Sequence, residues 1–226
     1  MNDIATFALD IVSDLGASYG DARVLDRRYQ RIETKNGKVG SVSDSESLGI
    51  GIRVIADGAW GFASSDNLST VNIEKLAKYA LEIAKASALV KDKDIILVEE
   101  LKHVDNWKTP IEKDPFKVPL EKKVELLLKI DALCRKVSGI QMVVGEMGFV
   151  RNHQFFVNTE GSSIEQTIYL SGVGYSAVAT DNHDIQKRSY PSSFGGQWSS
   201  LGYELLEQWP LVDNAQRIAE EAVALL

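Results

Sequence analysis

Apolar residues alternate with small or charged residues between positions 48 and 54. The apolar positions are Leu48, Ile50, Ile52 and Val54. The positions between them are Gly49, Gly51 and Arg53. A period of two predicts a strand with one buried face. Asp57-Gly58 then predicts a hairpin turn, because both residues tolerate the positive φ of such turns, and Trp60 and Phe62 open the returning strand.

The two glycines leave one face of this strand without side chains, so another backbone can approach it closely. The approaching layer is either another part of the same protein, packed between its halves, or a bound peptide or partner chain. For the second case we predict a substrate-binding set of five residues: Gly49, Gly51, Arg53, Trp60 and Phe62. The peptide backbone would approach at the glycines, and Arg53 would contact a peptide carbonyl or carboxylate.

The rest of the chain divides by the period of its apolar positions. A period near 3.6 predicts helices at 3–15, 73–84, 120–137 and 213–226. Period-two stretches predict further strands at 22–33, 39–45, 140–151, 154–158, 163–180 and 185–190, with a short apolar strand at 95–98. Turns are expected at Asn36-Gly37, at Thr159-Glu160-Gly161 and at Asp181-Asn182.

The order helix, four strands, helix therefore occurs twice. Gly37 to Asp57 and Gly161 to Asp181 both span 20 residues, and the pair Gly49-Ile50-Gly51 matches Gly172-Val173-Gly174 at an offset of 123. We interpret this as an internal duplication. The expected fold class is α+β, with two helix–four-strand–helix repeats and antiparallel sheets covered by helices. The expected division is 1–89 for the first repeat, 90–119 for a connector and 120–226 for the second repeat.

Composition is that of an ordinary globular protein, with 44% hydrophobic and 25% charged residues in 226. A net charge of −7 argues against a nucleic-acid partner. No apolar run approaches the roughly 20 residues of a membrane span, and the start Met-Asn-Asp-Ile carries no sign of a signal peptide. Cys134 is the only cysteine. We expect it to be a buried structural thiol in a cytoplasmic protein.

No catalytic constellation is visible. The histidines, His103, His153 and His183, lack the i, i+4 spacing of a helical metal clamp, and we expect each to be a loop or surface residue. A zinc site assembled from all three is the less favoured alternative. Dinucleotide, phosphate-loop and nucleophile-elbow motifs are missing too. The residues themselves therefore predict a scaffold with no catalytic residue and no metal ligand.

One long segment carries a family resemblance. Residues 49–65, which include Gly-Ile-Arg-Val-Ile and Asp-Gly-Ala-Trp-Gly-Phe, together with residues 31–37, resemble the N-terminal region of the TldD/PmbA family. The likeness extends over essentially the whole chain. It implies a cytoplasmic, zinc-dependent peptidase that acts on peptides or unfolded segments, as a homodimer or as a heterodimer with a paralogue. Members were once called modulators of DNA gyrase.

The sequence departs from this family in one respect. Catalytic members carry His-Glu-x-x-x-His, whose histidines bind zinc, and a later cysteine; here the motif is absent, and Cys134 lies in the wrong half. We therefore expect an N-terminal region that is inactive alone, with zinc on a C-terminal metallopeptidase domain absent from this chain. The alternative is a truncated paralogue, a non-catalytic binding or assembly module that pairs with a catalytic partner. Direct action on DNA or gyrase is disfavoured by an isoelectric point near 5.1.

Overall fold

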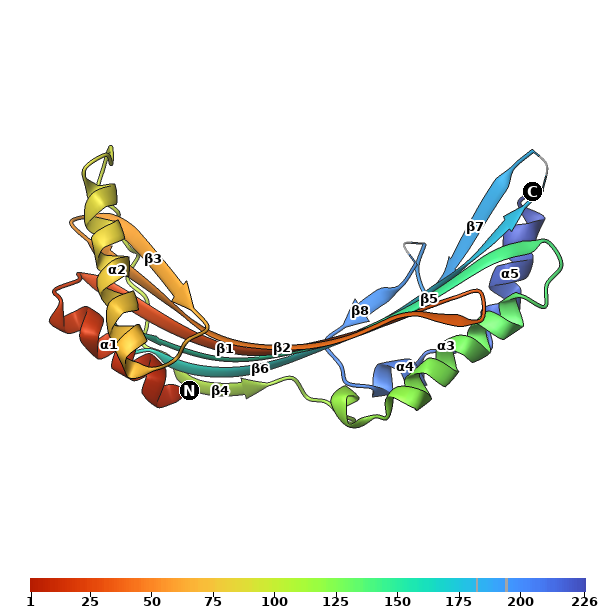
Figure 1. Cartoon of the computed structure of the whole chain (residues 1–226), viewed down its shortest axis with the longest axis horizontal. Helices are drawn as coiled ribbons and strands as arrows, with labels where there is room; N and C mark the ends of the chain where they lie inside the picture. The colour runs from red at the N-terminus through yellow and green to blue at the C-terminus, as the bar shows by residue number, and fades with distance from the viewer. Residues whose placement is uncertain (182, 194) are drawn as a thin grey trace. The chain divides into compact units, whose positions relative to one another are not determined.

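The computed structural model describes residues 1–181, 183–193 and 195–226 (Figure 1). The first half contains α1 (Asn2–Asp14), β1 (Tyr19–Lys35), β2 (Lys38–Ala56), β3 (Ala59–Ser65) and α2 (Thr70–Ala88). After β4 (Val104–Lys108) and the short 3-10 helix η1 (Pro115–Lys117) follow α3 (Leu120–Cys134), β5 (Ile140–Asn158), β6 (Ser163–Thr180), β7 (Ile185–Tyr190), β8 (Gln197–Ser199), α4 (Glu204–Gln208) and α5 (Ala215–Ala224).

The strands form a mixed sheet in the order β3-β2-β1-β5-β6-β4, with β7 and β8 also paired to β6. β3, β7 and β8 run antiparallel to their partners, whereas β4 runs parallel to β6. The α+β class and the antiparallel strands covered by helices are confirmed. The strands of both halves, however, belong to one hydrogen-bonded sheet and not to two.

Two pairs of expected strands are single long strands. The segments at 39–45 and 48–54 both lie in β2, and those at 140–151 and 154–158 both lie in β5. Strand pairing continues through the polar residues at the expected breaks. His153, at the expected break in β5, also contacts Glu165 of β6 through its Nε2 at 2.7 Å. The four strands expected in the first repeat are therefore β1, β2 and β3. The four expected in the second repeat are β5, β6 and β7.

The expected strand at 95–98 was wrong. These residues are irregular, and the strand of this region is β4, which pairs parallel to residues 163–167 of β6. Ile95 donates its backbone N–H to the carbonyl of Gly58 at 2.9 Å. This hydrogen bond ties the segment to the turn between β2 and β3. The turn expected at Asp181-Asn182 includes residue 182, which lies outside the described residues.

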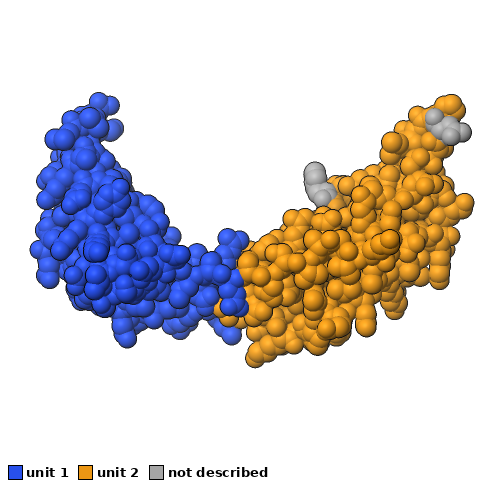
Figure 2. All heavy atoms as spheres, viewed as in Figure 1, with its two compact units in different colours: residues 1–27, 46–108, 152–167 blue, residues 28–45, 109–151, 168–226 orange. Residues whose placement is uncertain are grey.

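The chain folds into two compact units built from interleaved segments (Figure 2). Unit 1 comprises residues 1–27, 46–108 and 152–167, and unit 2 comprises residues 28–45, 109–151 and 168–226. Both units take residues from the four long strands, β1, β2, β5 and β6. Because the units are defined by compactness and not by chain order, the division at 1–89, 90–119 and 120–226 stays a prediction.

In unit 1, α1 and α2 cover one face of the strands. The alternation of β2 is as expected: Ile50, Ile52 and Val54 are at most 2% exposed and pack with the buried stripes of both helices. Leu48 is the exception, since it is 45% exposed. Gly61 of β3 brings the two layers together, because any side chain there would meet the backbone of α2.

In unit 2, buried residues of α3 and α5 pack against β5 and β6. Leu127, Ile130 and Cys134 of α3 share this core with Phe149 and Tyr175. Cys134 is buried as expected, and its Sγ donates to the Ala215 carbonyl at 3.2 Å. Burial raises the pKa of this thiol to about 12, so the thiolate needed for nucleophilic chemistry does not form at neutral pH.

Candidate functional site

A groove of about 570 Å³ lies in unit 1 over the face of β2 that carries the glycines. Alternation places this face opposite the side chains buried under the helices. Four of the five predicted site residues line the groove: Gly49, Gly51, Arg53 and Phe62. Residues outside the predicted set of five complete the lining: Asp21, Arg23, Leu25, Ser47, Leu48, Ile50, Ser64, Ser65 and Asp66.

The glycines shape the floor of this unit 1 groove. A Cβ at Gly51 would lie 3.1 Å from the Phe62 ring, so the ring rests directly on the bare strand. A Cβ at Gly49 would lie 3.2 Å from the backbone oxygen of Ser65. Phe62 stays 57% exposed, although a phenyl ring is ordinarily a core group. The result is an apolar wall beside a stretch of accessible backbone.

Arg53 forms an ion pair with a residue of the same chain, Asp21. Its Nε and Nη2 lie 2.8 and 2.7 Å from the same Asp21 oxygen, and Asp21 is only 5% exposed. Burial opposes the charge of Arg53, but the hydrogen bond and charge of Asp21 outweigh it, and the pKa of the guanidinium is raised. Trp60, the fifth predicted residue, lies outside the groove lining and stacks under Arg53 at 4.6 Å from ring centroid to Cζ.

Arg23 is the other guanidinium of the unit 1 groove. It lies over the Phe156 ring at 5.2 Å, and in the part of the chain that the structure describes it has no carboxylate partner. Asp21, Arg23 and Leu25 alternate along β1 and so face the same side as the glycines of β2. That alternation was the available signal, but using it required knowing that β1 lies beside β2.

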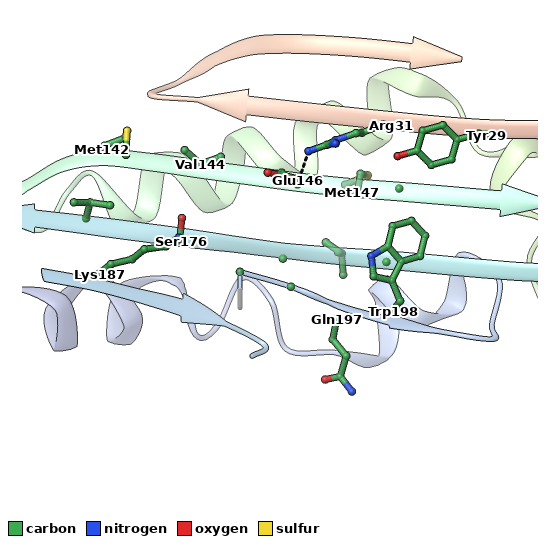
Figure 3. Close-up of a pocket in the computed structure, with 17 residues that line it drawn as sticks. Tyr29, Arg31, Met142, Val144, Glu146, Met147, Ser176, Lys187, Gln197 and Trp198 are labelled. Carbon is green, nitrogen blue, oxygen red and sulfur yellow. Dashed lines mark hydrogen bonds and ion pairs between the residues drawn. The ribbon is translucent and has the colours of Figure 1, made fainter. Parts of the chain in front are cut away.

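Unit 2 has a groove of its own, of about 500 Å³ (Figure 3). Arg31 of β1 and Glu146 of β5 form an ion pair at 2.6 Å in its wall. Figure 3 shows Tyr29 and Trp198 at one end of this groove and Met142 and Lys187 at the other. The sequence indicated this place only through its second glycine pair, Gly172-Val173-Gly174.

The second glycine pair is covered by the chain itself. β8 pairs with β6 so that Trp198 lies opposite Gly172. A Cβ at Gly148 or Gly172 would clash with the indole of Trp198, and a Cβ at Gly174 would clash with the backbone of Gly195 and Gly196. Here glycines in neighbouring strands make room for an aromatic side chain and for the segment that carries it.

The histidines do not form a metal centre. His103 precedes β4 and His183 follows β6 in an exposed loop, while His153 of β5 contacts Glu165 through its Nε2 at 2.7 Å. Across residues 1–181, 183–193 and 195–226, no three His, Cys, Asp or Glu residues gather as a metal site would need. The described residues therefore do not fit a catalytic metal. None of the helices in these ranges has the length and apolar character to cross a membrane.

Comparison with known proteins gives two family matches that follow one another along the chain. The family model described as PmbA/TldA metallopeptidase domain 1 matches residues 20–84, and that described as the PmbA/TldA metallopeptidase central domain matches residues 113–226. A metalloprotease of Methanothermobacter thermautotrophicus is 29% identical over 208 residues, which are 92% of this chain and 43% of the relative. A metalloprotease of Methanocaldococcus jannaschii is 29% identical over 74% of this chain and 37% of its own length.

Solved structures share the fold. A proposed modulator of DNA gyrase from Thermotoga maritima superimposes with a TM-score of 0.77 at 18% identity, over 99% of this chain and 48% of that one. TldE from Thermococcus kodakarensis gives a TM-score of 0.66 at 16% identity, over 98% and 46%. The chain thus spans less than half the length of the curated relatives and of these two structures that it matches.

Proposed function

The chain belongs to the PmbA/TldD metallopeptidase family, and from this premise we propose that it binds peptides or unfolded protein segments and helps to form the substrate cleft. Hydrolysis would take place in the cytoplasm at a zinc centre built from residues other than these. The described residues do not fit a metal, so we assign binding and not bond cleavage to them.

The observation that supports this role is the unit 1 groove beside an open strand edge. β3 pairs with residues 50–56 of β2, and no strand of the described residues continues along that side of residues 38–49. An extended peptide can add to such an edge through main-chain hydrogen bonds, which tolerate many sequences. That mode of recognition suits unfolded segments, because only an unfolded segment presents its backbone.

The experiment compares one protein in two states. Fluorescein-labelled α-lactalbumin, either native or reduced and carboxymethylated, is titrated with the 226-residue chain, and fluorescence anisotropy is recorded. We expect saturable binding of the unfolded form and none of the native form. Equal binding of both forms, or binding of neither, would contradict the proposed function.

A second candidate function, a non-catalytic assembly module, is favoured by the segment after α2. Large apolar side chains there are 80% exposed or more: Leu89, Val90, Ile96, Val98 and Leu101. So many exposed apolar side chains within one short stretch of sequence are typical of a protein interface. The partner would be a second copy or a paralogue, giving a homodimer or a heterodimer. Sedimentation of the chain alone and with a full-length paralogue tests this, and Ile96→Asp is expected to weaken the dimer.

A further inference from the structure

The two repeats differ at one strand edge. β2 and β6 hold equivalent places, since each carries a Gly-x-Gly pair and each then pairs with a short antiparallel strand, β3 or β7. On β6 the edge is continued beyond β7 by β8, which covers residues 171–173. On β2 no described strand continues the edge beyond the pair Ile50 and Ser65.

The position of Trp198 indicates what such an edge accepts. The strand offset of 123 places Gly49 where Gly172 lies, and both face the side of the sheet away from the helices. At Gly172 that space is filled by the indole of Trp198, carried on an extended segment of the same chain. At Gly49 the space remains part of the unit 1 groove.

The walls of the unit 1 groove suit the same kind of side chain. Leu48 and Phe62 are 45% and 57% exposed and border the glycine floor. The volume of about 570 Å³ is within the range of roughly 300–1,000 Å³ that is usual for ligand sites. An aromatic ring against Phe62 would gain edge or offset stacking in addition to burial.

We propose that residues 47–49 of β2 take an extended peptide as an added antiparallel strand, with an aromatic side chain of the peptide seated over Gly49. The seat over Gly49 makes the groove selective for segments that carry an exposed aromatic residue, which unfolded proteins present and folded ones bury. This inference rests on the proposed function, since it names the class of segment that the same groove selects.

The test uses three labelled peptides of one sequence that differ only at the central residue, which is Trp, Leu or Ala between Ser and Thr flanks. Anisotropy titrations with the full chain are expected to give the Trp peptide ~10-fold tighter binding than the Ala peptide. N-methylation of backbone nitrogens in the Trp peptide is expected to weaken binding, because an added strand needs its N–H donors.

Two variants locate the seat. Gly49→Ala adds a methyl group to the floor with one close contact, 3.2 Å to the Ser65 oxygen, and is expected to remove the preference for Trp. Gly40→Ala is the matched control, since it changes the same strand at a place where a Cβ meets nothing nearer than 3.5 Å. The control is expected to keep both affinity and preference.

The outcomes separate this inference from the function on which it rests. Equal binding of the Trp, Leu and Ala peptides, with the unfolded protein still bound, would overturn the aromatic seat and leave the proposed function standing. A preference for Trp that survives in Gly49→Ala would overturn its location. If neither the peptides nor the unfolded protein bind, both fail.

Discussion

Gly61 lies on β3 directly under α2, and Gly61→Ala is expected to destabilise unit 1 strongly. A Cβ at this position would overlap the carbonyl oxygen of Ala80 and lie 2.6 Å from the backbone nitrogen of Ala84. Both atoms belong to the helix backbone, so no rotamer change relieves the clash. The methyl group fits only if α2 moves away from the sheet.

The cost follows from what α2 buries. Its core side chains are Ile73, Leu76, Ala77, Ala80, Leu81 and Ala84. Overpacking of a core ordinarily costs about 1–3 kcal/mol, and the rigid backbone here places this variant at about 3 kcal/mol or above. For a chain of this size each kcal/mol lowers Tm by about 2–4 °C, so a decrease of roughly 6–12 °C is expected.

Differential scanning calorimetry measures the decrease, and hydrogen exchange of the α2 amides assigns it to unit 1. Gly40→Ala serves as the control, because a Cβ there meets no atom nearer than 3.5 Å. The same chemical change is expected to leave Tm unchanged or raise it slightly, because alanine reduces the freedom of the unfolded chain. If Gly61→Ala melts at the temperature of the parent, the packing of α2 on β3 described above is incorrect.

Three further results are expected. Lys123 is buried with its ammonium over the Phe149 ring, and burial lowers its pKa to about 8 from the usual 10.5. At pH values between these two pKa values, Lys123 is protonated in the unfolded state but not in the folded one, so the free energy of unfolding rises with pH. Urea unfolding at a series of pH values measures this rise, and Lys123→Met should abolish it. Arg53→Ala leaves the buried Asp21 carboxylate without its cation, which should lower the free energy of unfolding by about 1–3 kcal/mol. The double variant Arg53→Ala with Asp21→Ala should recover most of that loss. If Arg53→Ala alone is as stable as the parent, the pairing is excluded. Purified chain is expected to contain far less than one zinc per molecule by mass spectrometry, with Tm insensitive to a chelator; stoichiometric zinc would contradict the assignment of the metal to other residues.

The turns could be predicted because their residue types set the backbone locally. Asn36 and Asp57 both have φ of 50°, and Gly37 and Gly58 follow at 75° and 72°. Few residues other than Asn, Asp and Gly adopt such angles readily. The buried alternation of Ile50, Ile52 and Val54 was equally accessible, because one face of β2 packs on helices there.

The continuity of β2 could not be predicted in the same way. Residues 38–48 are exposed without a break, so no burial pattern distinguishes them from a loop. They form a strand because their backbone pairs with a neighbour. β4 and β8 depend even more on distant partners, residues 163–167 and 171–173 of β6. A period read along the chain does not contain this information.

The candidate site likewise contains residues that local sequence could predict and a residue that it could not. Gly49, Gly51, Arg53 and Phe62 could be grouped because one hairpin carries them all. Asp21 lies 32 residues before the Arg53 that it pairs with, and its importance emerges only when β1 is placed beside β2. Local sequence thus predicted the floor of the unit 1 groove, and tertiary pairing supplied the acid that immobilises its arginine.

The interleaving of the two units has a consequence for synthesis on the ribosome. Unit 1 begins at the first residue but draws its last segment from 152–167. The N-terminal helices and hairpins of unit 1 therefore remain without their last segment until residue 167 has been translated and has left the ribosome. A nascent chain arrested before that point should remain sensitive to proteases, and one arrested well after it should not.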